Sequence, residues 1–324
     1  MKKIILNTAL ILACVGYITT SCTRKSSDPT PATTASASTD DETAQVQNAG
    51  DQNNASTQID AAMNDAGNAL AGSSGARIDD AIQTSGCTVV TSTNFTSTVN
   101  GASKSVTITY DRSVCEKKVR SGTIVLTLTN GAKFSDVGAT WTVSFSGYTM
   151  RRVDRRGNQD TAYVEINGLH TVTNVNGGFV RVNMSLNPSP LVIHKVESNN
   201  MSLTFPNGKT RNWNVARQIT WDKDYTQTIT GFGTQGGFSD VVTWGTNRFG
   251  DTFFTRISTP IISKWACAYF PSQGQRIHQV TSAANGKQLT VTESILADAD
   301  GCAGGYAISF VGFNGQTRSK TVNW

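Results

Sequence analysis

The stretch GTIVLTLT (122–129) decides the fold of this chain, because an isoleucine and two leucines stand at every second position among threonine and valine. The stretch TWTVSFS (140–146) repeats the pattern with tryptophan, valine and phenylalanine. A period of two places successive side chains on opposite faces of a strand. One apolar face and one hydroxyl-rich face are typical of an antiparallel sheet with one side in water.

The same alternation returns along most of the chain after Cys87. It is found at 106–110, 180–186, 201–205 and 213–221. No helical pattern of ten or more residues follows Gln83. The sequence therefore predicts an all-β fold of hairpin-rich antiparallel sheets, arranged as a meander or a sandwich and preceded by a short helix and a disordered tether.

Asn-Gly pairs mark the expected turns. Seven of them begin at residues 100, 130, 167, 176, 207, 285 and 314. Asn-Gly suits the positive φ angles of type I′ hairpin turns. The pairs at 167, 207, 285 and 314 stand directly between alternating stretches, so we expect a tight hairpin at each of these four places.

Two segments separate the β region, placed at 86–324, from the N-terminal leader. Residues 22–55 are rich in Ser, Thr, Ala, Asp, Asn and Gln and predict a disordered tether, since they cannot bury enough apolar surface to fold. Residues 56–85 carry apolar side chains at helical spacing and predict a short helical segment, with Ser56 as its N-cap and Gly72 as its stop. The stretch NPSP (187–190) either divides the β region near residue 188 or interrupts one continuous sheet.

Residues 1–21 have the features of a secretory signal peptide. Two lysines precede an apolar stretch of 15 residues (4–18), which is shorter than the roughly 20 residues of a membrane-spanning helix. The stretch TTSC (19–22) resembles the lipobox of bacterial lipoproteins, in which the cysteine is acylated and becomes the mature N-terminus. This resemblance implies a fatty-acyl group such as palmitate on Cys22 and attachment to the membrane through that lipid. The sequence predicts an outer-membrane lipoprotein and leaves open whether it faces the periplasm or the cell surface.

Four cysteines follow the lipidation site, namely Cys87, Cys115, Cys267 and Cys302. An even number in an exported chain favours disulfides. Each neighbouring pair brackets one expected pair of strands, so we expect the local bonds Cys87–Cys115 and Cys267–Cys302. A structural zinc site is the alternative, although the chain has no C-x-x-C spacing and only three histidines.

Charge is divided along the chain. Residues 22–86 carry nine acidic and three basic side chains, a net charge of −6, whereas residues 87–324 carry 14 acidic and 23 basic ones, a net charge of +9. The densest basic stretch contains Arg151, Arg152, Arg155 and Arg156. These arginines are candidate contacts for an anionic glycan or envelope polymer, with a solvated loop as the alternative. Nucleic-acid binding would use interleaved aromatic residues, and only two tyrosines flank the stretch, so we do not expect it.

Residues that commonly carry chemistry form no recognisable motif. The histidines at 170, 194 and 278 have no partner at metal-ligand spacing, and we expect strand histidines to lie on the polar face. The stretch DADG (298–301) starts like a calcium loop but lacks the later ligands, so we expect an Asx turn beside Cys302. We therefore expect no metal and no cofactor. The carboxylates available to a glycoside hydrolase are Glu165, Glu197, Asp222, Asp224, Asp240 and Glu293.

Strand and turn motifs are found at 120–129, 141–148, 165–168 and 171–174, and again around Cys267 and Cys302. They resemble uncharacterised β-rich lipoproteins of Bacteroidota over about residues 115–324. The resemblance implies a β-rich envelope protein and carries no activity with it. We therefore expect a lipid-anchored cell-envelope protein with a binding or structural role, and the alternative is a carboxylate-based, glycan-active enzyme of the envelope.

Overall fold

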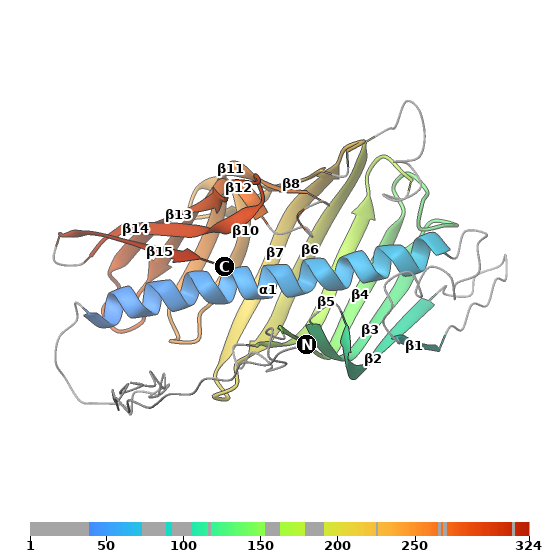
Figure 1. Ribbon diagram of the computed structural model, residues 1–324, viewed down its shortest axis with the longest axis horizontal. Coiled ribbons are helices and arrows are strands. Elements are labelled where there is room, and N and C mark those ends of the chain that lie inside the picture. The colour runs from blue at the N-terminus through green and yellow to red at the C-terminus, as the bar shows by residue number, and fades with distance from the viewer. Residues whose placement is uncertain are drawn as a thin grey trace, which may run out of the picture. The chain divides into compact units, whose positions relative to one another are not determined.

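The computed structural model describes residues 39–72, 89–92, 105–115, 118–152, 163–178, 191–224, 226–264, 267, 271–312 and 315–323. These residues form one α-helix and a single antiparallel sheet of 15 strands (Figure 1). The expected all-β antiparallel fold with an N-terminal helix is confirmed. No helix in the described ranges is both long and apolar enough to cross a membrane.

The helix α1 spans Thr39–Gly72. The first seven strands are β1 (Val89–Ser92), β2 (Ser105–Cys115), β3 (Lys118–Asn130), β4 (Thr140–Arg152), β5 (Glu165–Asn174), β6 (Val192–Thr204) and β7 (Thr210–Trp221). The next four are β8 (Thr226–Gly231), β9 (Gly233–Gln235), β10 (Phe238–Thr246) and β11 (Thr252–Lys264). The last four are β12 (Pro271–Thr281), β13 (Gln288–Ala297), β14 (Ala303–Val311) and β15 (Thr317–Asn323).

The sheet is a meander in which most strands pair with the next strand along the chain. Its order is β1-β2-β3-β4-β5-β6-β7-β10-β11-β12-β13-β14-β15. Strands β8 and β10 pair with different parts of the same edge of β7. Strand β10 pairs with residues 212–215, and β8 pairs with residues 217–221. Strand β5 pairs directly with β6, so the sheet is continuous past residue 188 and is not divided there.

Hairpins are confirmed at the Asn-Gly pairs of the β6–β7 and β12–β13 connections, although only the glycine of each pair has a positive φ, so neither turn is of type I′. Strands β14 and β15 also form a hairpin, but Asn314 lies outside the described residues. At the first of them, the amide of Phe205 donates to the carbonyl of Lys209 at 2.9 Å, and Gly208 has a φ of 77°. Only glycine and a few polar residues adopt such an angle readily, which explains the Asn-Gly preference.

The hairpin expected at Asn167-Gly168 is wrong, because this pair lies inside β5. The side-chain oxygen of Asn167 accepts the N–H of Gly147 at 2.7 Å, where the register between β4 and β5 shifts. Gly168 has a φ of 127°, and a Cβ on it would lie 2.8 Å from the sulfur of Met201. The pair therefore forms a bulge that bends the strand and does not reverse the chain.

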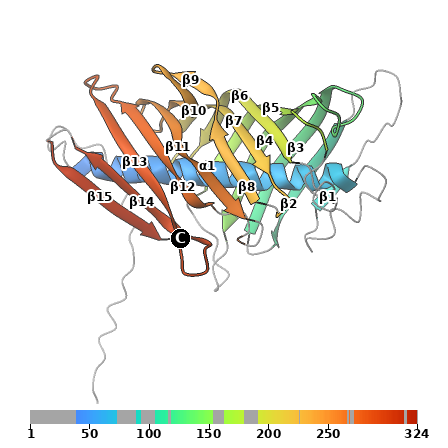
Figure 2. The ribbon, with the colours of Figure 1, turned by 90° about the horizontal axis from the view of Figure 1, so that it is seen from above.

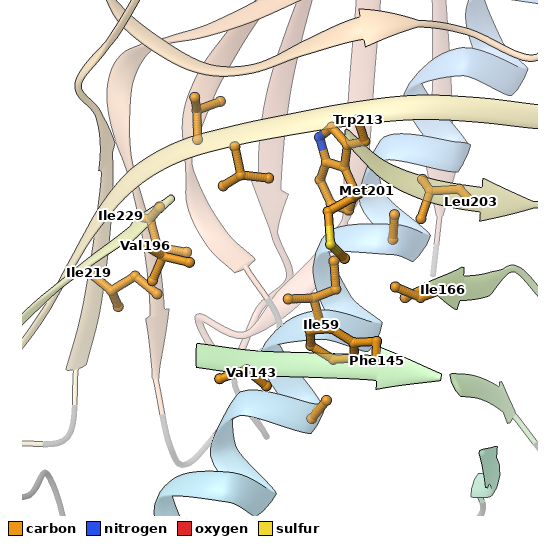
Figure 3. Packing of buried hydrophobic residues seen from close by; sticks show 14 of the residues in the cluster. Ile59, Val143, Phe145, Ile166, Val196, Met201, Leu203, Trp213, Ile219 and Ile229 are labelled. Atoms are coloured by element: carbon orange, nitrogen blue, oxygen red, sulfur yellow. The ribbon is translucent and has the colours of Figure 1, made fainter. Parts of the chain in front are cut away.

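The helix α1 packs across one face of the sheet, which we call the inner face (Figures 1 and 2). Its side chains Ala49, Ala55, Ile59 and Ala62 are at most 1% exposed and belong to the apolar core. Figure 3 shows Ile59 beside Met201 of β6 and Phe145 of β4. The two faces of the sheet are thus unequal, as the alternating sequence predicts.

The boundary between tether and helix differs from the expectation. Residues 39–55, expected in the disordered tether, are helical, and α1 begins well before Ser56. It ends at Gly72, the expected stop. The local prediction was wrong because the buried polar side chains of this segment find partners on strands far away in the sequence.

We expect Gly122→Ala to lower the free energy of unfolding by at least about 3 kcal/mol. Gly122 has a φ of +90°, and a Cβ on it would lie 2.3 Å from the carbonyl oxygen of Gly147. The matched control is Gly208→Ala, at a φ of +77° with nothing within 4 Å of the added carbon. In this control only backbone strain should lower the free energy of unfolding, by about 1–2 kcal/mol. Urea unfolding of both variants checks the difference, and equal midpoints would contradict the steric argument.

Candidate functional site

A buried group of polar side chains joins α1 to the inner face of the C-terminal strands. We call it the inner-face network. Its members are Asn48, Asp51, Gln52 and Asn53 of α1, Arg211 of β7, Thr243 of β10, Arg248 of the β10–β11 turn, Thr255 of β11, Arg276 and His278 of β12, and Glu293 of β13.

The sheet register explains how the strand members meet. Arg276 stands opposite Glu293, and His278 stands opposite Thr255. Cross-strand neighbours on one face of an antiparallel pair have Cβ atoms within about 5.5 Å. Polar residues at alternate positions of adjacent strands are thereby gathered on the inner face, where α1 covers them.

Glu293 is the most highly connected member. Its Oε1 accepts hydrogen bonds from Arg276 Nη1 at 3.0 Å and from Asn53 Nδ2 at 3.1 Å, and its Oε2 lies 2.8 Å from His278 Nε2. Arg276 also donates to the side-chain oxygen of Asn53. Burial raises the pKa of the Glu293 carboxyl, but Arg276 and His278 outweigh that effect and leave the pKa below its ordinary value.

Thr255, His278 and Glu293 form a hydroxyl–imidazole–carboxylate chain. The Thr255 hydroxyl lies 2.9 Å from His278 Nδ1, on the side of the ring opposite Glu293. A carboxylate only accepts, so Nε2 carries the proton toward Glu293, and Nδ1 of a neutral ring accepts from Thr255. The connectivity is that of a nucleophilic triad, but Thr255 is 0% exposed. Because Glu293 also accepts a hydrogen bond from Asn53, the chain is joined to α1.

Arg211 forms the second part of the network. It donates from Nη2 to Gln52 Oε1 at 2.7 Å and from Nη1 to Asn48 Oδ1 at 3.3 Å. Its guanidinium lies 4.0 Å from the ring centroid of Phe253. Burial lowers the pKa of Arg211 to about 10, partly offset by the negative charge of Asp51. Two amides one helical turn apart thus hold α1 against β7.

Asp51 and Arg248 form the third part. Arg248 Nε donates to Asp51 Oδ2 at 2.8 Å, and Arg248 Nη2 donates to the other carboxylate oxygen. The guanidinium also lies 4.2 Å from the ring centroid of Phe205. Burial raises the pKa of Asp51 in spite of this two-point pairing. The contact therefore adds geometric specificity to the docking of the helix, and desolvation offsets part of its Coulomb energy.

The structure confirms one of the two expected disulfides. Cys267 and Cys302 are bonded, with their Cα atoms 5.3 Å apart. Cys87 lies outside the described residues, and so does the expected bond to Cys115. Cys22, the expected lipidation site, also lies outside them.

The candidate anion contacts are only partly described. Arg151 is at the end of β4, and its guanidinium lies 3.7 Å from the ring centroid of Tyr163. Arg152 closes the same strand, opposite Lys118. Arg155 and Arg156 lie outside the described residues, so their contact with an anionic polymer stays a prediction.

The expectation that the strand histidines face the polar side is wrong for His170 and for His194. This residue is 0% exposed on the inner face, with its ring centroid 5.5 Å from that of Phe145. Burial and the nearby charge of Arg217 lower its pKa to about 3. His194 lies between Trp141 and Trp221, and burial lowers its pKa to about 4. Both rings are neutral members of the core.

The expected Asx turn beside Cys302 is confirmed. Asp300 Oδ1 accepts the amide of Cys302 at 2.8 Å, and the amide of Gly301 donates to the carbonyl of Asp298 at 3.0 Å. Among the described residues, no three His, Cys, Asp or Glu side chains are grouped so as to hold a metal ion.

Sequence reasoning missed the inner-face network apart from Glu293 and His278. The signal in α1 was weak, since asparagine and glutamine recur at helical spacing but are equally common in disordered segments. The partners are 159 to 240 residues away along the chain. The chain matches no model of a known protein family, no curated protein and no solved structure.

Proposed function

We propose that this chain is a lipid-anchored protein of the cell envelope with a binding or structural role. The signal peptide and the lipobox-like stretch before Cys22 support the anchor. The observation that supports a binding or structural role is that the polar side chains of the inner-face network bond to one another and to α1. The charged side chains of the network join α1 to the sheet, because Asp51 of α1 pairs with Arg248, and Glu293 and Arg276 both form hydrogen bonds with Asn53 of α1.

The position of α1 bears on how such an anchor would work. The helix begins at Thr39, so residues 23–38 separate Cys22 from the folded part. A fully extended segment of that length spans at most roughly 55 Å. The proposed anchor would therefore hold the sheet near the outer membrane, within reach of envelope polymers that the basic stretch around Arg151 could contact.

The glycan-active alternative has less support. Glycoside hydrolysis needs two carboxylates across a cleft. Four of the candidates have other bonds: Glu165 accepts from Asn167, Asp222 accepts the amides of residues 224 and 226, Asp224 pairs with Lys223, and Asp240 pairs with Arg256. Glu293 is buried beneath the helix.

Metabolic labelling with a fatty-acid analogue tests the anchor. We expect label on the wild-type protein and none on Cys22→Ala, because the thiol of Cys22 is the proposed acceptor. The matched control is Cys14→Ala, which changes another cysteine of the N-terminal segment and should remain labelled. Equal labelling of Cys22→Ala and the wild type would refute the proposal, as would recovery of both proteins in the same amounts from the membrane fraction.

A further inference from the structure

Three connections between strands lie side by side at one end of the sheet. They are the β6–β7 connection (205–209), the β10–β11 connection (247–251) and the β12–β13 connection (282–287). The strand ends that they join stand opposite one another in a single row, which contains Asn212, Thr246, Thr252, Thr281 and Gln288. We call these three connections the basic rim.

Side-chain contacts join the three connections of the basic rim. Lys209 Nζ lies 5.7 Å and Arg248 Cζ lies 6.0 Å from the centroid of the Phe249 ring, so two of the connections meet at this ring. Asp251 accepts the amide of Ala283 at 3.0 Å, which joins the β10–β11 connection to the β12–β13 connection. The rim is therefore one continuous surface.

The basic rim carries a net positive charge. Its basic side chains are Lys209, Arg248 and Lys287, and Asp251 is its one acidic side chain, so the net charge is +2. Asp51 of α1 pairs with Arg248 and leaves +1. Both lysines of the rim are exposed.

The opposite end of the same strands is acidic. Its connections, at 222–225, 265–270 and 298–302, contain one basic and four acidic side chains, a net charge of −3. An anionic surface would therefore attract the basic rim and repel the other end, which orients the strands relative to such a surface.

Phe249 at the tip of the basic rim is 39% exposed. Of the aromatic residues whose burial the structure describes, it is the only exposed one. An exposed aromatic ring between cations is the combination with which peripheral proteins bind a membrane surface. The apolar side chain enters the boundary between headgroups and acyl chains, and the basic side chains lie near anionic lipids.

We propose that the basic rim binds the surface of an anionic phospholipid membrane. Phe249 enters the headgroup boundary, while Lys209 and Lys287 lie against the phosphates of the lipids. The choice of a membrane as the partner rests on the proposed location in the cell envelope, whereas the test does not depend on the lipid anchor.

The test uses the full chain carrying Cys22→Ala, so that no acyl group contributes, and measures co-sedimentation with vesicles. We expect binding to vesicles that contain phosphatidylglycerol, weakening as salt rises, and much weaker binding to vesicles of phosphatidylcholine alone. The double variant Lys209→Gln/Lys287→Gln should bind the phosphatidylglycerol vesicles about 25-fold more weakly, since each lysine contributes a factor of about five. Phe249→Ser should also weaken binding but leave its salt dependence unchanged.

The matched control is Lys223→Gln/Lys264→Gln, which removes two exposed lysines from the opposite end and should leave binding unchanged. Equal binding by the two double variants would overturn the proposal. Retention on a polyuronate resin in place of vesicle binding would also overturn it, because the partner would then be an acidic polymer. Dimers at low salt in place of vesicle binding would instead assign the rim to the acidic end of a second copy, and would overturn the proposal as well.

Discussion

Glu293→Ala is expected to lower the free energy of unfolding by about 3–5 kcal/mol, because it leaves the buried guanidinium of Arg276 without its carboxylate. Glu293 is 0% exposed and bonds to Arg276, His278 and Asn53. This single truncation therefore leaves a buried positive charge, an imidazole and a side-chain amide of the helix without their common hydrogen-bond partner. Urea unfolding followed by far-UV circular dichroism measures the loss.

Two further variants separate charge from packing. Glu197→Ala removes an exposed carboxylate of β6 and should change stability by under about 0.5 kcal/mol. Arg276→Met in the Glu293→Ala background removes the stranded charge and should recover part of the loss. If the double variant is no more stable than Glu293→Ala, the buried ion pair is not the cause.

The pH dependence of stability gives an independent check on Glu293. Its pKa in the folded protein is below the ordinary value of 4.5, so it contributes stability above pH 4.5 that is lost as the pH falls through the folded value. Asp51 has the opposite sign, because its raised pKa favours the folded state as the pH falls. The free energy of unfolding of Glu293→Gln should therefore fall less at acid pH than that of the wild type.

The strands could be predicted because their signal is local. The alternation in 122–129 places its apolar residues on the inner face, where Ile124 and Leu126 are 0% exposed. The same rule failed at Asn167-Gly168, because a positive φ serves a bulge as well as a turn and only the partner strand decides between them. The pairing of β5 with β6 across NPSP (187–190) also depends on contacts that no local pattern encodes.

The buried polar residues could not be predicted for a related reason. A histidine flanked by threonine and leucine has the same local sequence whether it faces water or the core. His170 lies on the same buried face as Ile166 and Val172, and its ring packs against that of Phe145. The polar residues of α1 similarly indicate disorder when only the sequence is considered. They are helical because they form hydrogen bonds with Arg211 and Glu293, which are distant in the sequence.

Ile59→Asp is expected to release α1 from the sheet, at a cost of about 3–5 kcal/mol for burying a carboxylate without a partner. Ile59 is 1% exposed and lies beside Phe145 and Met201 (Figure 3). Asparagine, aspartate, threonine and glycine are common in α1 and are poor helix formers, so the helix depends on docking. Release should therefore unfold it.

The expected result is a loss of helical circular dichroism while the sheet signal remains, together with new protease cleavage within residues 39–72. Gln47→Asp adds the same charge at an exposed position of α1 and should leave both measurements unchanged. Unchanged helix content and protease resistance in Ile59→Asp would show that α1 is stable without the sheet. Loss of both the helical signal and the protease resistance would show that residues 39–55 are disordered, as their composition predicts, when they are not packed on the inner face.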